Sequence, residues 1–400
     1  MKSILVLLER KPYGGAEFAT HLIIKMLANE GFDLTVATGT RNRVQDMKNV
    51  KWIYSPLLDA PSKIHLWINM LRLRLDRLSE LIKACDIVYI PRLAYPAIPL
   101  AKKLGKKVIV HMHDYQLLNY SGALLAANEE QHHPNFLSDI KTSMQNEVLE
   151  SNGAWRAILC SWATPLNVLS RRWVTDADDI ICVSKSQSRI MERELPTLAD
   201  KIRVVYNPLP SISTAERRLD KNTIIYLGGD RYAKGFHTFL RASYRLLKKH
   251  LDIEFLLLGK YRNMNRSIIE TLGKRSEGAY NLLGYQEHGE VLRLYAISHA
   301  LLFPSIMNEP MPYAVLEAML SGTVPIASQV GGIPEIVEGT FAERMMFKPN
   351  NVDECIERTE SMLAMTNEQV QNVGLGLRDA VLKKFDPEAT RKNLVETFLS

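Results

Sequence analysis

The sequence predicts an α/β protein made of two Rossmann-like parallel-sheet domains that face each other across a cleft. Short apolar runs of strand length alternate with amphipathic helical segments along most of the chain. This pattern starts twice, at Ser3–Leu8 and again at Thr223–Leu227, with a polar, proline-containing run between the two series. A chain of 400 residues is also long enough for two domains with large cores.

The first domain is predicted to open with a strand, a helix and a second strand. Ser3–Leu8 is typical of a buried parallel strand, a helix is expected from about Ala16 to Asn29, and Phe32–Ala37 is the next strand. The pair Gly14-Gly15 lies at the strand-to-helix turn, where backbone amides can face a phosphate. A glycine turn that binds no ligand is the alternative.

A long amphipathic helix is predicted over Lys63–Lys83. It combines an apolar stripe with a basic face. Such a helix either covers the sheet with its basic face in solvent or rests on an anionic membrane surface. The core strand Asp86–Ile90 that follows favours a sheet-covering helix, as a βαβ unit requires.

A strand at Lys107–His111 brings His113 to its carboxyl end, where parallel sheets form ligand clefts. His113 is a candidate base or hydrogen-bond donor to a sugar hydroxyl, and a packed histidine that ends a strand is the alternative. The region from Tyr115 to about Asn167 is weakly patterned, helical in parts and a candidate for specificity. Its histidines, His132 and His133, have no nearby partners for a metal site.

No metal site and no cofactor are predicted. Asp176 and Asp178 form a DxD string, which in other enzymes binds a metal and a nucleotide diphosphate, but here it comes before a strand and is interpreted as a solvated strand entry. The cysteines form no CxxC pair, which favours a reducing, cytoplasmic setting. They are Cys85, Cys160, Cys182 and Cys355.

We place the first domain at residues 1–206, a linker at 207–220 and the second domain at 221–385. The linker begins where Asn207-Pro208-Leu209-Pro210 interrupts the last strand of the first series. Asp386 and Pro387 then begin a final helix, as N-cap and first helical residue.

The second domain carries the most informative stretch, Asn308–Gly339. Glu309 lies in a loop that enters a helix predicted at Tyr313–Leu320, and Glu317 lies within that helix. The free N–H groups of Met311, Tyr313 and Ala314 would cluster at the positive end of the helix, which is a natural anion site. We interpret this stretch as a pocket for a sugar joined to a diphosphate.

Two basic residues, Arg231 and Lys234, lie in the glycine-rich turn Gly228–Phe236 of the second domain. They are candidate counter-charges for a phosphate, as the lysine of a P-loop is, although the Walker string itself is absent. Two exposed cations on a turn are the alternative.

These motifs resemble those of the retaining, nucleotide-sugar-dependent glycosyltransferases of the GT-B fold, family 4 type. The match is best from about Thr223 to Gly339 and looser in the first half. Glu309 and Glu317 are similar to the E-x7-E motif of that family, and Lys234 in AKGF is similar to its diphosphate-binding lysine. Where the family has an arginine after the strand glycine, this chain has Gly229, and Arg231 follows two residues later.

The resemblance implies roles for these residues. Glu317 would bind the ribose hydroxyls, Glu309 and His113 the donor sugar, and Lys234 the diphosphate. The catalytic candidates are His113, Lys234 and Glu309. The donor-binding candidates are Gly14, Gly15, Arg231, Lys234, Glu309, Met311, Pro312, Tyr313 and Glu317. The final helix, residues 386–400, is expected to cross back to the first domain.

The expected function is transfer of a sugar, with retention, from a UDP- or GDP-sugar to a hydroxyl of a glycan or lipid-linked acceptor, in polysaccharide or glycolipid biosynthesis. A nucleotide-sugar-binding protein without turnover is the alternative from another class. A nicotinamide dehydrogenase is disfavoured because no clean GxGxxG follows the first strand.

The net positive charge of the chain comes entirely from its first half. Residues 1–206 contain 27 Lys and Arg against 21 Asp and Glu, whereas residues 207–400 contain 23 of each. This favours an anionic or lipid-linked acceptor at a membrane surface, with peripheral association at the inner face of the membrane. Nucleic acid is disfavoured because aromatic residues are not interleaved with the basic ones in any recognised motif.

Overall fold

The computed structural model describes residues 2–9, 14–41, 47, 49–129, 135–150, 153–212, 217, 219, 221–249, 252–276 and 278–400. The predicted linker at 207–220 lies partly outside the described residues, and His132 and His133 lie wholly outside them.

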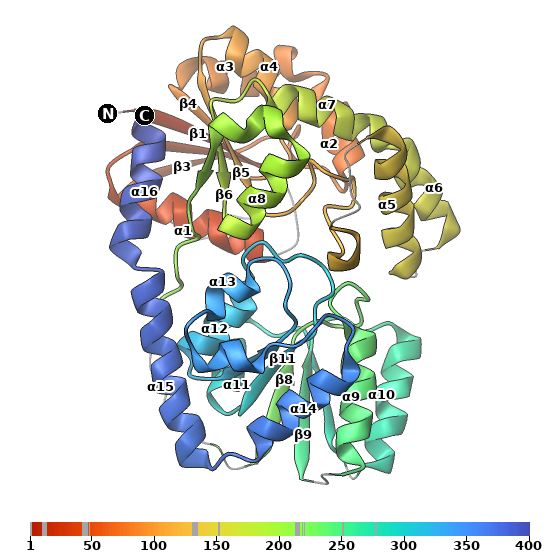
Figure 1. The fold of residues 1–400 in the computed structure, drawn as a ribbon. Coiled ribbons are helices and arrows are strands. Elements are labelled where there is room, and N and C mark those ends of the chain that lie inside the picture. The colour runs from red at the N-terminus through yellow and green to blue at the C-terminus, as the bar shows by residue number, and fades with distance from the viewer. Residues whose placement is uncertain are drawn as a thin grey trace.

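The first domain is built on a parallel sheet of seven strands in the order β3-β2-β1-β4-β5-β6-β7 (Figure 1). The strands are β1 Ser3–Leu8, β2 Asp33–Thr38, β3 Val50–Tyr54, β4 Ile87–Ile90, β5 Lys107–Met112, β6 Asp179–Cys182 and β7 Ile202–Val204. The α-helices are α1 Gly15–Asn29, α2 Lys63–Met70, α3 Arg77–Ala84, α4 Ile98–Lys103, α5 Phe136–Leu149, α6 Ala154–Trp162, α7 Thr164–Val174 and α8 Lys185–Glu194. The 3-10 helices are η1 Leu73–Leu75, η2 Tyr95–Ala97, η3 Ala126–Asn128 and η4 Pro196–Lys201. The central strands are buried on both faces, which explains their continuous apolar runs.

The second domain has a parallel sheet of five strands in the order β10-β9-β8-β11-β12. The strands are β8 Asn222–Tyr226, β9 Ile253–Leu258, β10 Tyr280–Gly284, β11 Ala300–Phe303 and β12 Val324–Ala327. The helices are α9 Phe236–Leu247, α10 Asn263–Arg275, α11 His288–Ala296, α12 Tyr313–Leu320, α13 Ile333–Val337, η5 Phe341–Met345, α14 Val352–Leu363, α15 Asn367–Lys384 and α16 Pro387–Leu399. The prediction of two parallel-sheet α/β domains is confirmed.

The single helix predicted over Lys63–Lys83 is wrong. The segment forms α2, η1 and α3, and the break falls at Asp76, whose carboxylate accepts a hydrogen bond from the backbone N–H of Leu78 at 2.8 Å. Aspartate favours an N-cap over a helix interior, so Asp76 begins a new helix. The predicted apolar stripe is split as a result, and Leu71 and Leu75 are 84% and 93% exposed.

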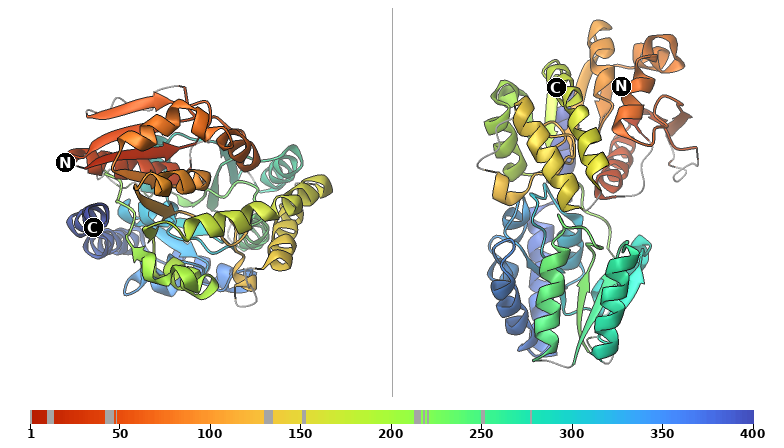
Figure 2. Two further views of the ribbon diagram at one scale, coloured as in Figure 1. Left: turned by 90° about the horizontal axis from the view of Figure 1, so that it is seen from above. Right: turned by 90° about the vertical axis from the view of Figure 1, so that its right-hand side faces the viewer.

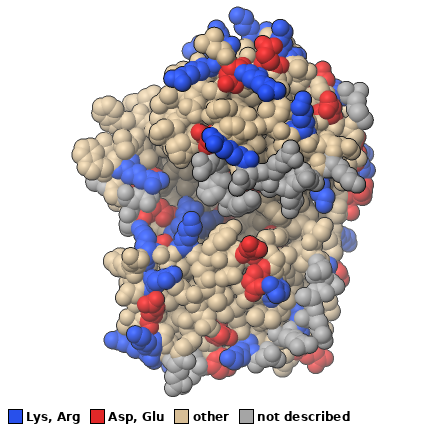
Figure 3. Space-filling model, turned by 180° about the vertical axis from the view of Figure 1, so that it is seen from behind, with Lys and Arg blue, Asp and Glu red and all other residues tan. Residues whose placement is uncertain are grey.

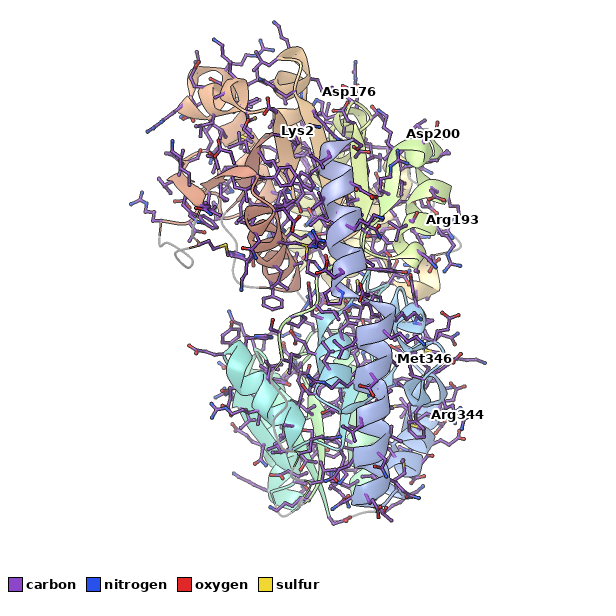
Figure 4. All side chains as sticks on the ribbon, turned by 90° about the vertical axis from the view of Figure 1, so that its left-hand side faces the viewer. Lys2, Asp176, Arg193, Asp200, Arg344 and Met346 are labelled. Carbon is purple, nitrogen blue, oxygen red and sulfur yellow. The ribbon has the colours of Figure 1, made fainter. Side chains whose placement is uncertain are left out.

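The last helix, α16, packs on the first domain although it follows the second in the chain. Phe398 is fully buried, and its ring lies 5.2 Å from that of Tyr89 in an edge-on contact. The Nζ atom of Lys107 donates to the carbonyl of Thr397 at 2.7 Å, and that of Lys2 donates to the carbonyl of Leu399 at 2.6 Å. Figure 4 shows Lys2 beside the end of this helix, so the two chain termini lie side by side.

The two domains also contact each other through α13. The carboxylate of Glu335 accepts the backbone N–H of Lys185 at 3.0 Å, at the start of α8, and the hydroxyl of Tyr206 at 2.5 Å. Figure 3 shows the surface hollowed at the waist between the domains, where lysine and arginine side chains gather. The side chains that follow the strand ends of both sheets lie near this waist.

Candidate active site between the two domains

Glu309 lies in the loop between β11 and α12 and is buried. Its Oε1 atom accepts a hydrogen bond from Ser305 Oγ at 2.8 Å and an ion-paired one from Lys234 Nζ at 2.6 Å. Two glycines allow the neighbouring loop to approach this backbone. A Cβ at Gly331, whose φ is +54°, would lie 2.2 Å from the Glu309 carbonyl oxygen, and Gly332 N–H donates to that oxygen at 2.8 Å.

Lys234 is placed by the turn between β8 and α9. The next residue, Gly235, has φ +74°, and a Cβ there would lie 1.7 Å from the carbonyl oxygen of Pro304. The turn is therefore pressed against the loop that carries Glu309. The lysine side chain remains one quarter exposed, so its charge is paired and still accessible from the waist.

Glu317 lies in the second turn of α12, buried beneath a histidine of α11. Its Oε1 atom is 2.8 Å from Nε2 of His288, and this hydrogen bond raises the pKa of His288. The His288 ring also contacts Phe18 of the first domain, with the ring centroids 4.8 Å apart. His288 belongs to no sequence motif, so its position in the site could not be predicted from the sequence.

The glycine pair of the first domain faces the start of α12. Gly14 is the N-cap of α1, and a Cβ on Gly15 would have Cδ2 of Tyr313 as its neighbour at 3.8 Å. The Tyr313 hydroxyl donates to the Pro208 carbonyl at 2.8 Å, and its ring meets Phe18 edge-on at 5.2 Å. Met311 and Pro312 lie directly before this helix, so the structure brings Gly14, Gly15 and the α12 N-terminus together.

His113 follows β5 and stacks on His111, with the ring centroids 4.2 Å apart. Its Nε2 atom is shielded from solvent and has no hydrogen-bond partner among the described residues. Burial lowers the pKa of His113 to about 3, and the Arg92 guanidinium contributes to the same direction. The imidazole is therefore neutral near pH 7. It can exchange a hydrogen bond with a hydroxyl, but it is a weak general base.

This environment predicts a pH dependence of folding stability. An unfolded histidine titrates near pH 6.5, well above the folded value, so the unfolded chain binds the extra proton as the pH falls below about 6.5. The native protein should lose about 2 kcal/mol through His113 between pH 7 and pH 5. Urea unfolding at both pH values should therefore show a smaller loss for His113→Gln than for the wild type. Equal losses would contradict a buried, neutral His113.

Arg231 and Lys234 lie in the same turn, but their side chains contact different carboxylates. Nε of Arg231 lies 3.8 Å from the carboxylate of Glu150, at the end of α5, and the arginine side chain is more than half exposed. The same carboxylate accepts the backbone N–H groups of Tyr232 and Ala233 at 3.1 and 3.0 Å. Glu150, Arg231, Tyr232 and Ala233 line a pocket of about 400 Å³ between the first domain and the β8–α9 turn. Arg231 is thus directed at Glu150, whereas Lys234 is directed at Glu309.

The backbone conformation explains why this chain has Gly229 at the position where the family has an arginine. Gly229 has φ +57°, and a Cβ there would lie 2.7 Å from the carbonyl oxygen of Lys260. A side chain is disfavoured at this place, both by the left-handed conformation and by the close approach.

Two further cross-domain contacts come from the weakly patterned region. Nδ2 of Asn308, next to Glu309, donates to the Glu129 carboxylate at 2.8 Å, and Glu150 holds the β8–α9 turn as described above. Neither acid belongs to a motif, so sequence reasoning missed both. Asp178 of the DxD string pairs with Lys102 and accepts the Val108 N–H, each at 2.7 Å. Within the described ranges, no group of three or more His, Cys, Asp or Glu side chains is placed to hold a metal ion.

Two family models match adjacent parts of the chain. The model for Glycosyltransferase Family 4 covers residues 13–210, and the model for Glycosyl transferases group 1 covers residues 212–374. The chain belongs to the group 1, family 4 type glycosyltransferases. The family predicted from the sequence motifs is thereby confirmed.

Curated relatives of this glycosyltransferase share part of its length. It is 28% identical over 188 residues to a human subunit of phosphatidylinositol N-acetylglucosaminyltransferase, a match that covers 45% of the chain and 38% of the relative. It is 28% identical over 169 residues to a glycogen synthase of Mycobacterium tuberculosis, with 41% and 40% covered. The glycosyltransferase chain thus spans less than half the length of either relative.

Solved structures match over the whole chain. Anabaena HepE in complex with UDP and glucose has a TM-score of 0.70 at 15% identity, and all of both chains is covered. Sucrose-phosphate synthase from Thermosynechococcus elongatus has a TM-score of 0.73 at 16% identity, with 100% of this chain and 98% of the other covered. The likeness shows the fold of this glycosyltransferase to be GT-B, as predicted.

Proposed function

We propose that this glycosyltransferase is a hexosyltransferase that moves a sugar, with retention, from a UDP- or GDP-sugar to a hydroxyl of a glycan or lipid-linked acceptor. The observation that carries the proposal is the Lys234–Glu309 pair at 2.6 Å, beside the N-terminus of the helix that holds Glu317. Support for UDP comes from Anabaena HepE, which binds UDP and glucose, and support for a lipid-linked acceptor comes from the name of the human relative.

The leaving diphosphate is the main electrostatic problem of this reaction. As the bond between the anomeric carbon of the donor and its diphosphate breaks, negative charge develops on the phosphate oxygens, and the Lys234 ammonium with the first amides of α12 would stabilise it. The phosphate competes with Glu309 for Lys234, so Glu309 is released to accept hydrogen bonds from the donor sugar. In this scheme Glu317 binds the ribose hydroxyls, and no metal ion is required.

The proton of the acceptor hydroxyl also needs a destination. Glu309 and Glu317 are engaged with the donor, and His113 is too weak a base at neutral pH. We therefore assign the proton to an oxygen of the leaving phosphate, while neutral His113 exchanges a hydrogen bond with the donor sugar. The contacts of Phe18 with Tyr313 and His288 allow the domains to close over the donor and exclude water.

A ligand screen with one variant tests this function. UDP or GDP should raise the melting temperature of the wild type, because a ligand that binds only the folded state stabilises it. Glu317→Gln should weaken that nucleotide by about tenfold or more, since hydrogen bonds to a charged group are lost. Glu368→Gln changes an exposed residue in the first turn of α15, serves as the matched control and should behave as the wild type.

Transfer to a panel of glycan and lipid-linked acceptors then separates the two functional classes. Formation of a glycosylated product supports the proposal. Nucleotide binding with neither transfer nor donor hydrolysis would favour a binding protein without turnover. An unchanged nucleotide affinity in Glu317→Gln would remove Glu317 from the ribose site.

Membrane proximity is part of the proposal. Among the described residues, none of the helices combines the length and apolar character needed to cross a membrane. The excess cations of the first half and the proposed lipid-linked acceptor support peripheral association at the inner face of the membrane.

A further inference from the structure

The helix α6 turns its apolar face outward. Trp155, Ile158, Leu159 and Trp162 recur at helical spacing and lie on one face. The two tryptophans are 79% and 82% exposed and Leu159 is 61% exposed, whereas Ala157 and Cys160 on the opposite face are buried. A surface helix normally packs its apolar face against the rest of the protein, whereas the apolar face of α6 is exposed to solvent and is a candidate binding surface.

Neighbouring helices extend this surface. Leu137 and Val148 of α5 and Val168 and Leu169 of α7 are exposed as well. Helices α5 and α6 project at the right-hand side of the first domain in Figure 1, and in the right-hand panel of Figure 2 they face the viewer. We call the outward faces of α5, α6 and α7 the helical shoulder. In Figure 3 this side of the molecule lies at the left edge, where most of the surface is uncharged.

The exposed charged side chains of the helical shoulder are all positive. Within described residues 135–150 and 153–175, the exposed charged side chains are the cations Lys141, Arg156 and Arg172. The acids of the same ranges are buried or half-buried. Of these, Asp139 pairs with Arg171 at 2.7 Å and Glu147 pairs with Arg156 at 3.0 Å.

A second apolar and basic strip adjoins the shoulder through α2. The rings of Trp67 and Trp173 lie 5.1 Å apart, and Lys63 Nζ donates to Asn167 Oδ1 at 2.9 Å, so α2 packs against α7. The segment from the end of α2 through η1 to the start of α3 exposes apolar and basic side chains together. They are Ile68, Leu71, Arg72, Arg74, Leu75 and Arg77.

We propose that the helical shoulder docks on an anionic phospholipid membrane, with Trp155 and Trp162 in the interface. Tryptophan is favoured at the level of the lipid headgroups, an amphipathic helix lies in that plane, and anionic lipid attracts the surrounding cations. A second copy of the chain fits the helical shoulder less well than an anionic membrane does. A two-fold contact would place this surface against itself and bring the exposed cations together without acids to pair them.

The shoulder is continuous with the interdomain pocket. Arg156 of α6 and the end of α5 line the pocket of about 400 Å³, together with Arg231 and Arg262 of the second domain. A lipid anchored under the shoulder would thus present its headgroup to a polar pocket beside the Lys234 turn, in which the three arginines are matched by Glu147, Glu150 and Asp230. This delivery of acceptor rests on the proposed function, whereas the docking itself does not.

Flotation with liposomes tests the docking. The full chain should float with vesicles of phosphatidylcholine and phosphatidylglycerol at low salt and much less with phosphatidylcholine alone. Trp155→Ser/Trp162→Ser should lower the partition coefficient about tenfold for each tryptophan removed. Lys141→Ser/Arg172→Ser should lower it about fivefold for each cation, and only on the anionic vesicles. Leu375→Ser/Leu382→Ser, which changes exposed leucines of α15, should float as the wild type does.

The readouts separate the possible failures. Because the changed side chains point outward, all variants should keep the wild-type melting temperature and its shift with UDP or GDP. A wild type that does not float, or tryptophan variants that float like the α15 control, would overturn the proposal. Light scattering that shows a dimer lost in the tryptophan variants would assign the shoulder to a second copy instead. Docking without any nucleotide shift would contradict the proposed function and leave the docking intact.

Discussion

Lys234→Ala is expected to lower kcat/KM for sugar transfer by about 10²–10³-fold, the effect of removing one preorganised charge from a developing oxyanion. The substitution also leaves Glu309 buried with Ser305 as its described hydrogen-bond partner, so a carboxylate faces the incoming diphosphate without its counter-charge. Both changes act at the phosphate, and the loss should appear in kcat as well as in donor affinity. Initial rates over a range of donor concentrations measure it.

A second substitution separates the two causes. Glu309→Gln removes the uncompensated charge, so the double variant Lys234→Ala/Glu309→Gln should lose less activity than the sum of the two single losses in free energy. Lys249→Ala is the matched control, because this lysine is exposed just after α9 and pairs with Glu360. Additive losses, or a Lys234→Ala variant as active as the control, would remove Lys234 from the phosphate site.

The parallel sheets could be predicted because their signal is local. A strand covered on both faces is apolar at successive positions, as in Ser3–Leu8, and that pattern needs no knowledge of its neighbours. The break at Asp76 was missed because the apolar spacing continues through it. The capping preference of Asp76 sets the start of α3, while Leu71 and Leu75, which lie between the end of α2 and that cap, remain in solvent.

The two carboxylates of the site were also found from the sequence, because one loop and one helix fix their separation. Their hydrogen-bond pairings were not, although Lys234 itself was a candidate. Ser305 is near Glu309 in the chain, but His288 and Lys234 reach the acids only when separate strands of the sheet come together. Glu129 and Glu150 are contributed by the other domain, so their role depends on how the two domains meet.

Arg231 illustrates the same limit. Its position in a glycine-rich turn marks it as a candidate counter-charge for a phosphate, yet the direction of its side chain depends on Glu150, which lies in the weakly patterned region. The conformation of Gly229 could be anticipated only from its contact with Lys260, which follows the neighbouring strand β9. Sequence spacing thus locates the turn, and long-range contacts decide which cation points toward Glu309 in the proposed donor site.

Gly235→Ala is expected to destabilise the protein by about 3–5 kcal/mol, through a left-handed backbone and an overpacked contact together. The Cβ would lie 1.7 Å from the carbonyl oxygen of Pro304, which is backbone and has no side-chain rotamer by which to move away. Because Pro304 leads into the loop of Glu309 and Gly235 follows Lys234, any relaxation also separates the ion pair. Transfer activity should therefore fall even at temperatures where the variant remains folded.

Substitutions at two other glycines separate the cost of the left-handed backbone from the cost of the close contact. Gly105 has φ +69° with open space at its Cβ, so Gly105→Ala should cost only the conformational term, about 1–2 kcal/mol. Gly376 lies within α15, also with open space, and Gly376→Ala should stabilise by about 0.5–1 kcal/mol. Urea unfolding of the three variants should rank them in this order. A Gly235→Ala variant no less stable than Gly105→Ala would show that the Lys234 turn is not held against the Glu309 loop, and the proposed geometry of the donor site would fail with it.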